Sequence, residues 1–231
     1  MREILRQGLP AIGVSEACVE PLLSFADLLL KKNEVMNLTA ITDPKDVAAL
    51  HLLDSLTLLS AADFANKRLI DVGTGAGFPG LPIAIACPDC QVTLLDSLGK
   101  RVDFLKEVCD ALSLSNVTCV HARAEEYVPS CREQYDIAAS RAVAELRTLS
   151  ELCLPYVKPG GLFLAMKSVG TEEELTAAQP AIRLLGAQTE RIWDYPLPST
   201  EITHRLIVLR KRTSTPKKYP RRFAVIKKQP L

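Results

Sequence analysis

The chain has 231 residues, of which 48% are hydrophobic and 24% charged, a composition typical of a globular protein with its own core. No apolar run approaches the roughly 18 residues that a membrane span needs, and the first residues lack the apolar stretch of a signal peptide. We therefore expect a cytoplasmic protein with no membrane association. Its seven cysteines are an odd number, which favours reduced thiols.

The charge is unevenly distributed. Residues 202–231 contain ten Lys or Arg and no Asp or Glu, which leaves the rest of the chain with a net charge of −9. A basic C-terminal segment on an acidic body is a candidate nucleic-acid contact, although a solubilising tail has the same composition. Cys87 and Cys90 have CxxC spacing, but no second ligand pair accompanies them, so we expect no metal site.

The order of predicted elements indicates an α/β fold. Helices are expected at residues 15–32, 43–60, 79–86, 99–112, 144–156 and 171–185. Strands are expected at residues 69–72, 91–96, 116–120, 135–139, 162–166, 188–195 and 204–210. Strands separated by helices imply a mainly parallel sheet covered on both faces, here with a final antiparallel pair.

Three segments follow from this order. Residues 1–65 form an N-terminal helical extension, and residues 66–212 form a Rossmann-like domain with a mainly parallel, seven-stranded sheet. Residues 213–231 are interpreted as an extended basic tail that is unable to build its own core. We expect cofactor binding to persist without this tail, because the cofactor motifs lie elsewhere.

The most informative motif is the loop at residues 71–80, between a predicted strand and a predicted helix. Its glycines, Gly73, Gly75 and Gly77, have GxGxG spacing, so that Phe78 stands where a dinucleotide fingerprint requires glycine. Glycines allow the backbone to approach a ligand closely. The spacing disfavours NAD and suits S-adenosylmethionine, which has no pyrophosphate to seat on the helix N-terminus. A tight turn without a ligand is the alternative.

An acid at the end of the next strand completes the pattern. Asp96 lies nineteen residues after Gly77, where a carboxylate accepts hydrogen bonds from ribose hydroxyls. A helix cap is its alternative role. Adenine is expected near the end of the third strand, at the backbone of Ala124 and Glu125. Together these features predict a methyltransferase that depends on S-adenosylmethionine.

The end of the fourth strand, residues 136–142, is where this fold binds the methyl acceptor. It lacks the Asn/Asp-Pro-Pro-aromatic clamp of adenine-amine methylation, and it has Ser140 and Arg141 where pyrimidine-carbon methylation needs a cysteine. The motif offers no His or Lys as a general base, which suits an acceptor with a lone pair, such as guanine N7. Arg141 is therefore a candidate contact to the base, a phosphate or the cofactor, with a structural ion pair as the alternative.

Several segments together make the sequence similar to the RsmG (GidB) family. They are residues 37–41, 51–56, 71–82, 95–97, 100–101, 140–142, 158–161, 219–222 and 228–231. The resemblance implies transfer of a methyl group from S-adenosylmethionine to guanine N7 in the decoding-region loop of 16S ribosomal RNA. The implied partner is that RNA or the small ribosomal subunit.

The resemblance also implies roles for particular residues. Cofactor contacts are implied at Gly73, Phe78, Asp96, Arg141 and the backbone of Ala124 and Glu125. Catalytic or RNA roles are implied for Arg123, Lys167 and Arg205, although Ser168 stands where the family commonly has glycine. Other basic residues are candidate RNA contacts, namely Lys100, Arg101, Lys217, Lys218, Arg221 and Arg222.

Some alternatives stay open. His51 and Asp54 lie three residues apart on one helix face, and packing against the cofactor loop is favoured over a catalytic pair. The alternative substrates of such a methyltransferase are another RNA, a small molecule or a protein. A different class of function is a ribosome-associated RNA-binding protein without turnover, which the intact glycine loop and Asp96 disfavour. We expect a monomer.

Overall fold

The structure is a computed structural model that describes residues 1–141, 144–198 and 200–231, so Ala142 of the predicted acceptor motif lies outside the described residues. Seven strands of the described chain form one sheet in the order β3-β2-β1-β4-β5-β7-β6. They are β1 (Arg68–Val72), β2 (Gln91–Asp96), β3 (Val117–His121), β4 (Tyr135–Ser140), β5 (Val157–Ser168), β6 (Ala187–Pro196) and β7 (Thr203–Lys211). The first five run parallel, and β7 is antiparallel to both neighbours. The predicted fold class is confirmed.

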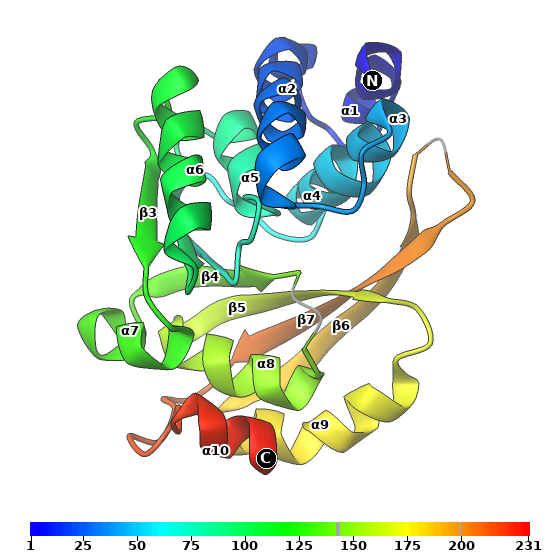
Figure 1. The fold of residues 1–231 in the computed structure, drawn as a ribbon. Coiled ribbons are helices and arrows are strands. Elements are labelled where there is room, and N and C mark those ends of the chain that lie inside the picture. Colours follow the sequence, from blue (N-terminus) through cyan, green and yellow to red (C-terminus); the bar gives the residue numbers. More distant parts are fainter. Residues whose placement is uncertain (142–143, 199) are drawn as a thin grey trace.

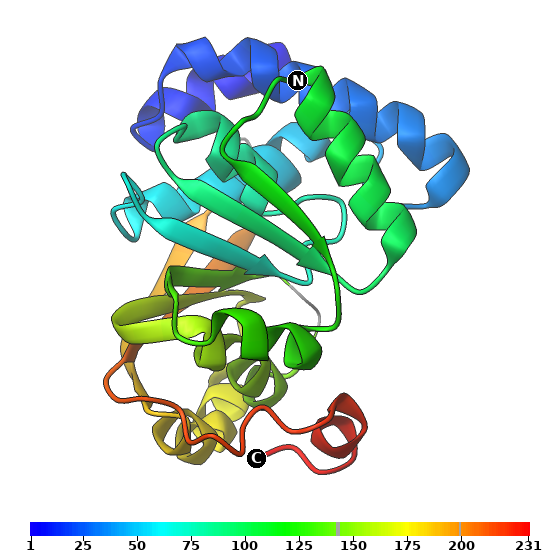
Figure 2. The ribbon, with the colours of Figure 1, turned by 90° about the vertical axis from the view of Figure 1, so that its left-hand side faces the viewer.

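Helices cover both faces of the sheet (Figure 1). One side carries α1 (Arg2–Ala11), η1 (Glu16–Cys18), α2 (Val19–Met36), α3 (Pro44–Asp46), η2 (Val47–Leu53), α4 (Asp54–Leu56), η3 (Thr57–Ser60), α5 (Gly80–Ala86) and α6 (Gly99–Ala111). The other side carries α7 (Ala124–Cys131), α8 (Leu146–Cys153), η4 (Leu154–Tyr156), α9 (Glu172–Leu184) and α10 (Phe223–Lys228). Figure 2 shows α10 and the N-terminal helices on opposite sides of the sheet.

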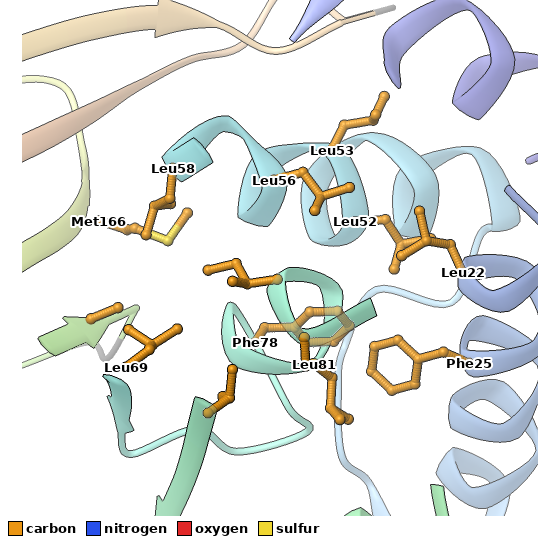
Figure 3. Close-up of a cluster of buried hydrophobic side chains, with 14 of the residues drawn as sticks. Leu22, Phe25, Leu52, Leu53, Leu56, Leu58, Leu69, Phe78, Leu81 and Met166 are labelled. Atoms are coloured by element: carbon orange, nitrogen blue, oxygen red, sulfur yellow. The ribbon is translucent and has the colours of Figure 1, made fainter. Parts of the chain in front are cut away.

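The N-terminal extension shares one core with the sheet domain. Leu22, Phe25 and Leu52 are fully buried against Phe78 and Leu81 of the glycine loop and α5 (Figure 3). The rings of Phe25 and Phe78 lie 5.2 Å apart. Burying such a side chain stabilises a fold by about 1.5–3 kcal/mol. The extension therefore supports the backbone that is predicted to bind the cofactor.

The interpretation of residues 213–231 as an extended tail is wrong. Tyr219 and Ile226 are 5% and 0% exposed, and both belong to the core on the α8 side of the sheet. The segment has no core of its own, and its apolar side chains pack against the apolar surface of the sheet domain. Its start is fixed by the buried Lys211, whose Nζ donates to the carbonyl of Leu154 at 2.7 Å and to Thr215 Oγ1 at 2.5 Å. Burial lowers the pKa of Lys211 to about 8.

The position of the site follows from the strand order. β1 lies between β2 and β4, and the chain leaves β1 for α5 on one face of the sheet but leaves β4 for α8 on the other. In open α/β sheets, ligands bind where the connections diverge in this way, beyond the carboxyl ends of the strands. Gly73 follows β1 and Arg141 follows β4, so both lie at this crevice.

Candidate active site

The glycine loop is held closed by the buried carboxylate of Asp71. Its Oδ2 accepts from Thr74 Oγ1 at 2.7 Å and from the backbone N–H of Gly80 at 2.8 Å, which ties the two ends of the loop together. Burial raises the pKa of Asp71 to about 6, against the lowering effect of these two bonds. Gly77 has a φ of 103°, and a Cβ there would overlap Leu81, so this position requires glycine.

Asp96 connects this loop to the end of β2. Its Oδ2 accepts from the backbone N–H of Gly75 at 2.9 Å, and its Oδ1 accepts from that of Leu98 at 2.9 Å. Leu98 immediately precedes α6, and Arg101 on α6 lies 3.6 Å from the carboxylate. Asp96 therefore fixes the loop and the helix start together, and its side chain also lines the pocket described next.

A largely apolar hollow of about 230 Å³, here called pocket A, opens beyond β1, β2 and β3. It is lined by Val72, Gly73, Leu95, Asp96, Ser97, Ala122, Arg123, Ala124, Glu125, Ala144, Leu149, Leu152 and Phe223. It thus brings together the predicted cofactor residues Gly73, Asp96, Ala124 and Glu125. The carbonyl of Ala124 is already bonded to the hydroxyl of Tyr156, so this oxygen has a partner within the protein.

A second hollow of about 260 Å³, here called pocket B, shares Gly73 with pocket A as a lining residue. It is lined by Leu38, Thr39, His51, Gly73, Thr74, Gly75, Ala76, Phe78 and Arg141. A Cβ added at Gly75 would lie 4.0 Å from the Gly73 carbonyl oxygen, its nearest neighbour, and would otherwise project into open space. Pocket B therefore joins the cofactor loop to the acceptor edge of β4.

Arg141 has a fixed position at the edge of pocket B. One terminal nitrogen donates to the carbonyl of Leu50 at 3.0 Å and faces Asp54 at 3.4 Å, and the other lies 3.1 Å from His51 Nδ1. The guanidinium also lies over the ring of Phe78, 4.8 Å from its centroid. Burial lowers the pKa of Arg141, and the Asp54 carboxylate opposes this shift. Arg141 thus both faces the pocket and belongs to a structural ion pair.

His51 packs against the cofactor loop, as its position on the helix predicts. Its ring stacks on Phe78 with a centroid distance of 4.5 Å, and its Nε2 lies 2.8 Å from Thr39 Oγ1. Because Arg141 donates to Nδ1, we assign the ring proton to Nε2, which then donates to Thr39. Burial, reinforced by the nearby Arg141, lowers the pKa of His51 to about 4. His51 is therefore neutral at pH 7.

Asp54 collects donors from three parts of the chain. The carboxylate is fully buried and accepts from Tyr195 Oη at 2.8 Å and from His204 Nδ1 at 3.0 Å, in addition to its pairing with Arg141. Tyr195 lies next to the end of β6 and His204 next to the start of β7, so both lie at the same edge of the sheet as the end of β4. Neither Tyr195 nor His204 was predicted from the sequence as a site residue. Their position near the ends of two predicted antiparallel strands is the sequence feature that indicates this edge of the sheet.

The three implied catalytic or RNA residues lie in different surroundings. Arg123 is exposed at the start of α7 and lines pocket A. Lys167 donates to the carbonyl of Ala144 at 3.0 Å and pairs with Glu174 at 2.7 Å. Arg205 is held by Asp194 and Glu172, which raise its pKa. Of these three residues, the structure brings only Arg123 to the wall of pocket A or B.

The candidate RNA contacts form two groups. Lys100 and Arg101 line a third hollow of about 450 Å³, pocket C, together with Val35, Met36, Asn37, Leu38, Ser97, Leu98 and Gly99. In the C-terminal segment, Lys217, Lys218 and Arg222 are exposed. Arg221 differs from them because its guanidinium binds the buried carboxylate of Glu151 at 2.6 Å. Arg221 therefore has a partner within the protein, and its role as an RNA contact stays a prediction.

The lining of the pockets fits the chemistry of S-adenosylmethionine. Pockets A and B share Gly73 in their walls, so one elongated ligand that passes this residue would contact both. Pocket A combines apolar walls with the carboxylate of Asp96, and pocket B is bordered by a glycine loop whose missing side chains leave space. The described residues contain no group of three or more His, Cys, Asp or Glu that could hold a metal ion. They also contain no helix long and apolar enough to cross a membrane.

The fold and these pockets define a Rossmann-like methyltransferase that uses S-adenosylmethionine. Residues 19–202 match the GidB family, described as rRNA small subunit methyltransferase G, and the chain belongs to this family. The predicted resemblance is thereby confirmed.

Two full-length relatives have the same name, Ribosomal RNA small subunit methyltransferase G. The one from Alkaliphilus oremlandii is 44% identical over 100% of this chain and 99% of its own length. The one from Alkaliphilus metalliredigens is 46% identical over 99% of this chain and 98% of its own. Among solved structures, precorrin-6y C5,15-methyltransferase from Geobacter metallireducens has a TM-score of 0.53 and 16% identity, covering 69% of this chain and 87% of its own. At that identity the likeness concerns the fold alone.

Proposed function

We propose that this protein transfers a methyl group from S-adenosylmethionine to N7 of a guanine in the decoding-region loop of 16S ribosomal RNA. One observation carries the proposal: the lining of pocket B suits an acceptor that has no proton to lose. Among the described residues that line it, there is no cysteine, lysine or carboxylate. His51 is the candidate base, yet both of its nitrogens have partners and its pKa is about 4.

Methyl transfer to guanine N7 requires the acceptor to be positioned against the methyl group. The bound cofactor supplies an electrophilic methyl group on a sulfonium, and guanine N7 offers a lone pair in the plane of its ring. The protein must hold this lone pair in line and exclude water. Arg141 is fixed by Leu50, His51 and Asp54 at the edge of pocket B. Its planar fork suits a hydrogen bond to guanine O6, next to N7.

The exposed basic residues are the proposed RNA contacts. We assign phosphate contacts to Lys100, Arg123, Lys217, Lys218 and Arg222, because these side chains are exposed. Arg101, Arg205 and Arg221 are paired with carboxylates and would have to exchange these partners to bind RNA. Lys167 is proposed to hold the chain near Ala144 at the rim of pocket A.

The remaining proposals concern setting and assembly. We propose that the enzyme acts in the cytoplasm, where ribosomal RNA is its substrate, and that it is a monomer that acts on bare 16S RNA or on the small subunit. A methyltransferase for another RNA, a small molecule or a protein is the competing function, since pockets A and B alone would serve it. The exposed basic groups favour RNA as the substrate over a small molecule or a protein.

The test is incubation with radiolabelled S-adenosylmethionine and total ribosomal RNA from cells that lack the methyl group, followed by mapping of the label. We expect label in one guanine of the 16S RNA, on N7. Label confined to another base, or to none of the ribosomal RNAs, would contradict the proposal.

A further inference from the structure

One wall of pocket A comes from the C-terminal end of the chain. The other walls are formed by the ends of β1 and β2, the start of α7 and helix α8. Phe223, the first residue of α10, lines the same hollow. From its sequence this segment is a candidate RNA contact or a solubilising tail, and no motif connects it with the cofactor.

Two anchors hold Phe223 at this wall. On its N-terminal side, the backbone N–H and Nε of Arg221 each donate to Glu151 Oε1 at 2.8 Å, and a terminal nitrogen donates to Oε2 at 2.6 Å. Glu151 lies on α8 and is fully buried, and a buried carboxylate is tolerated only when it is compensated in this way. On the C-terminal side, Ile226 is fully buried in the core.

The chemistry of this wall suits an adenine ring. Leu149, Leu152 and Phe223 provide an apolar surface, and the backbone of Ala124 and Glu125 provides polar groups in the same hollow. Adenine has two apolar faces and a polar edge, so it needs both kinds of surface. An aromatic side chain offers a large contact to a base at a small cost in rotamer freedom.

We propose that Phe223 is a cofactor-binding residue that forms the wall against which the adenine of S-adenosylmethionine packs. Helix α10 is then part of the cofactor site, and a chain that ends at Arg212 loses cofactor affinity. This reverses the expectation that cofactor binding persists without residues 213–231. The inference rests on the proposed S-adenosylmethionine-dependent function.

Calorimetry with S-adenosylhomocysteine, which carries the same adenosine, tests this role without turnover. Phe223→Ala should weaken binding about tenfold, in line with the loss of one base–aromatic contact. Phe223→Leu should weaken it less, because it keeps apolar volume and loses only the ring. Val225→Ala is the matched control, since Val225 lies on the same helix and is 44% exposed. It should bind as the wild type does.

The affinities of these variants distinguish a contact of the Phe223 ring from an effect of α10 docking. Unchanged affinity in folded Phe223→Ala protein overturns the inference. Equal losses in Phe223→Ala and Val225→Ala also overturn it, because they would reflect the docking of α10 and not a contact of the ring. If Phe223→Ala does not fold, Phe223→Leu with a normal melting temperature takes its place, and unchanged affinity there overturns it. A wild-type protein that binds no S-adenosylhomocysteine would refute the proposed function itself.

Discussion

Asp54 and Arg141 form an ion pair that joins the N-terminal extension to the acceptor edge of the sheet. Asp54 Oδ2 lies 3.4 Å from a guanidinium nitrogen, and the carboxylate is fully buried while the Arg141 side chain remains 21% exposed. The pair therefore has one member inside the core and one facing pocket B. Asp54 is a positioning residue for Arg141, because it fixes the guanidinium without lining either pocket.

Asp54→Asn should reduce turnover more than it reduces cofactor affinity. The amide preserves shape but removes the charge opposite Arg141, and breaking a buried pair costs about 3–5 kcal/mol when the remaining charge is uncompensated. Because Arg141 is part-exposed, we expect a smaller loss of stability and at least a tenfold loss in kcat. Tyr195→Phe is the control, since it removes one bond to Asp54 and keeps the ion pair. Normal turnover in Asp54→Asn, measured beside S-adenosylhomocysteine binding, would exclude this role.

The neutral His51 makes the fold less stable in acid. Its pKa is about 4 in the folded protein and about 6.5 when unfolded, so the unfolded chain binds more protons between these values. Stability from this group is complete above pH 6.5 and is lost as pH falls toward 4. Between pH 7 and pH 5 the loss is roughly 2 kcal/mol.

Urea unfolding at both pH values checks this expectation. His51→Gln should lose less stability than the wild type over that interval, by about the same 2 kcal/mol. Parallel losses in the two proteins would mean that His51 does not carry the pH dependence.

Asp96→Ala should weaken S-adenosylmethionine binding at least about tenfold, because charge-assisted bonds to the ribose hydroxyls contribute roughly 1.5–3 kcal/mol each. It also removes the acceptor for the backbone of Gly75 and Leu98, so the melting temperature should fall as well. Asp103→Ala, on the exposed side of α6, is the control for charge. Calorimetry with wild-type affinity in Asp96→Ala would remove Asp96 from the cofactor site.

The exposed part of the basic C-terminal segment should set the salt dependence of RNA binding. Each phosphate neutralised on a single strand contributes about −0.7 to the slope of log affinity against log salt. Replacing Lys217, Lys218 and Arg222 with Gln should make the slope shallower by roughly 2. The matched control replaces Arg6, Lys45 and Arg183, three exposed basic residues elsewhere. If both triple variants change the slope equally, only net charge matters.

The sequence was most informative where chemistry and spacing act together. The glycine loop and Asp96 could be placed because strand, turn and acid follow one another at fixed distances. The seven strands could be placed from their apolar runs. Arg141 could be proposed because it directly follows a strand whose carboxyl end had to lie beside the loop.

The rest depended on contacts between distant segments. Tyr195 and His204 bind Asp54, which is more than 140 residues away in the sequence, and no local sequence pattern predicts such a contact. Phe223 and Arg221 looked like parts of a solvated tail because their neighbours are lysines and arginines. Their partners, pocket A and Glu151, lie on elements far away along the chain, so that only the folded arrangement shows the burial of this segment.

The central claim is that the acceptor atom is guanine N7. It is tested most directly with two 16S RNA transcripts, one ordinary and one in which 7-deazaguanine replaces guanine, so that a C–H group stands in place of N7. Both are offered, bare and assembled into small subunits, with radiolabelled S-adenosylmethionine. We predict label in the ordinary RNA and none in the substituted RNA, although the protein binds both. Equal labelling of the two would contradict the account.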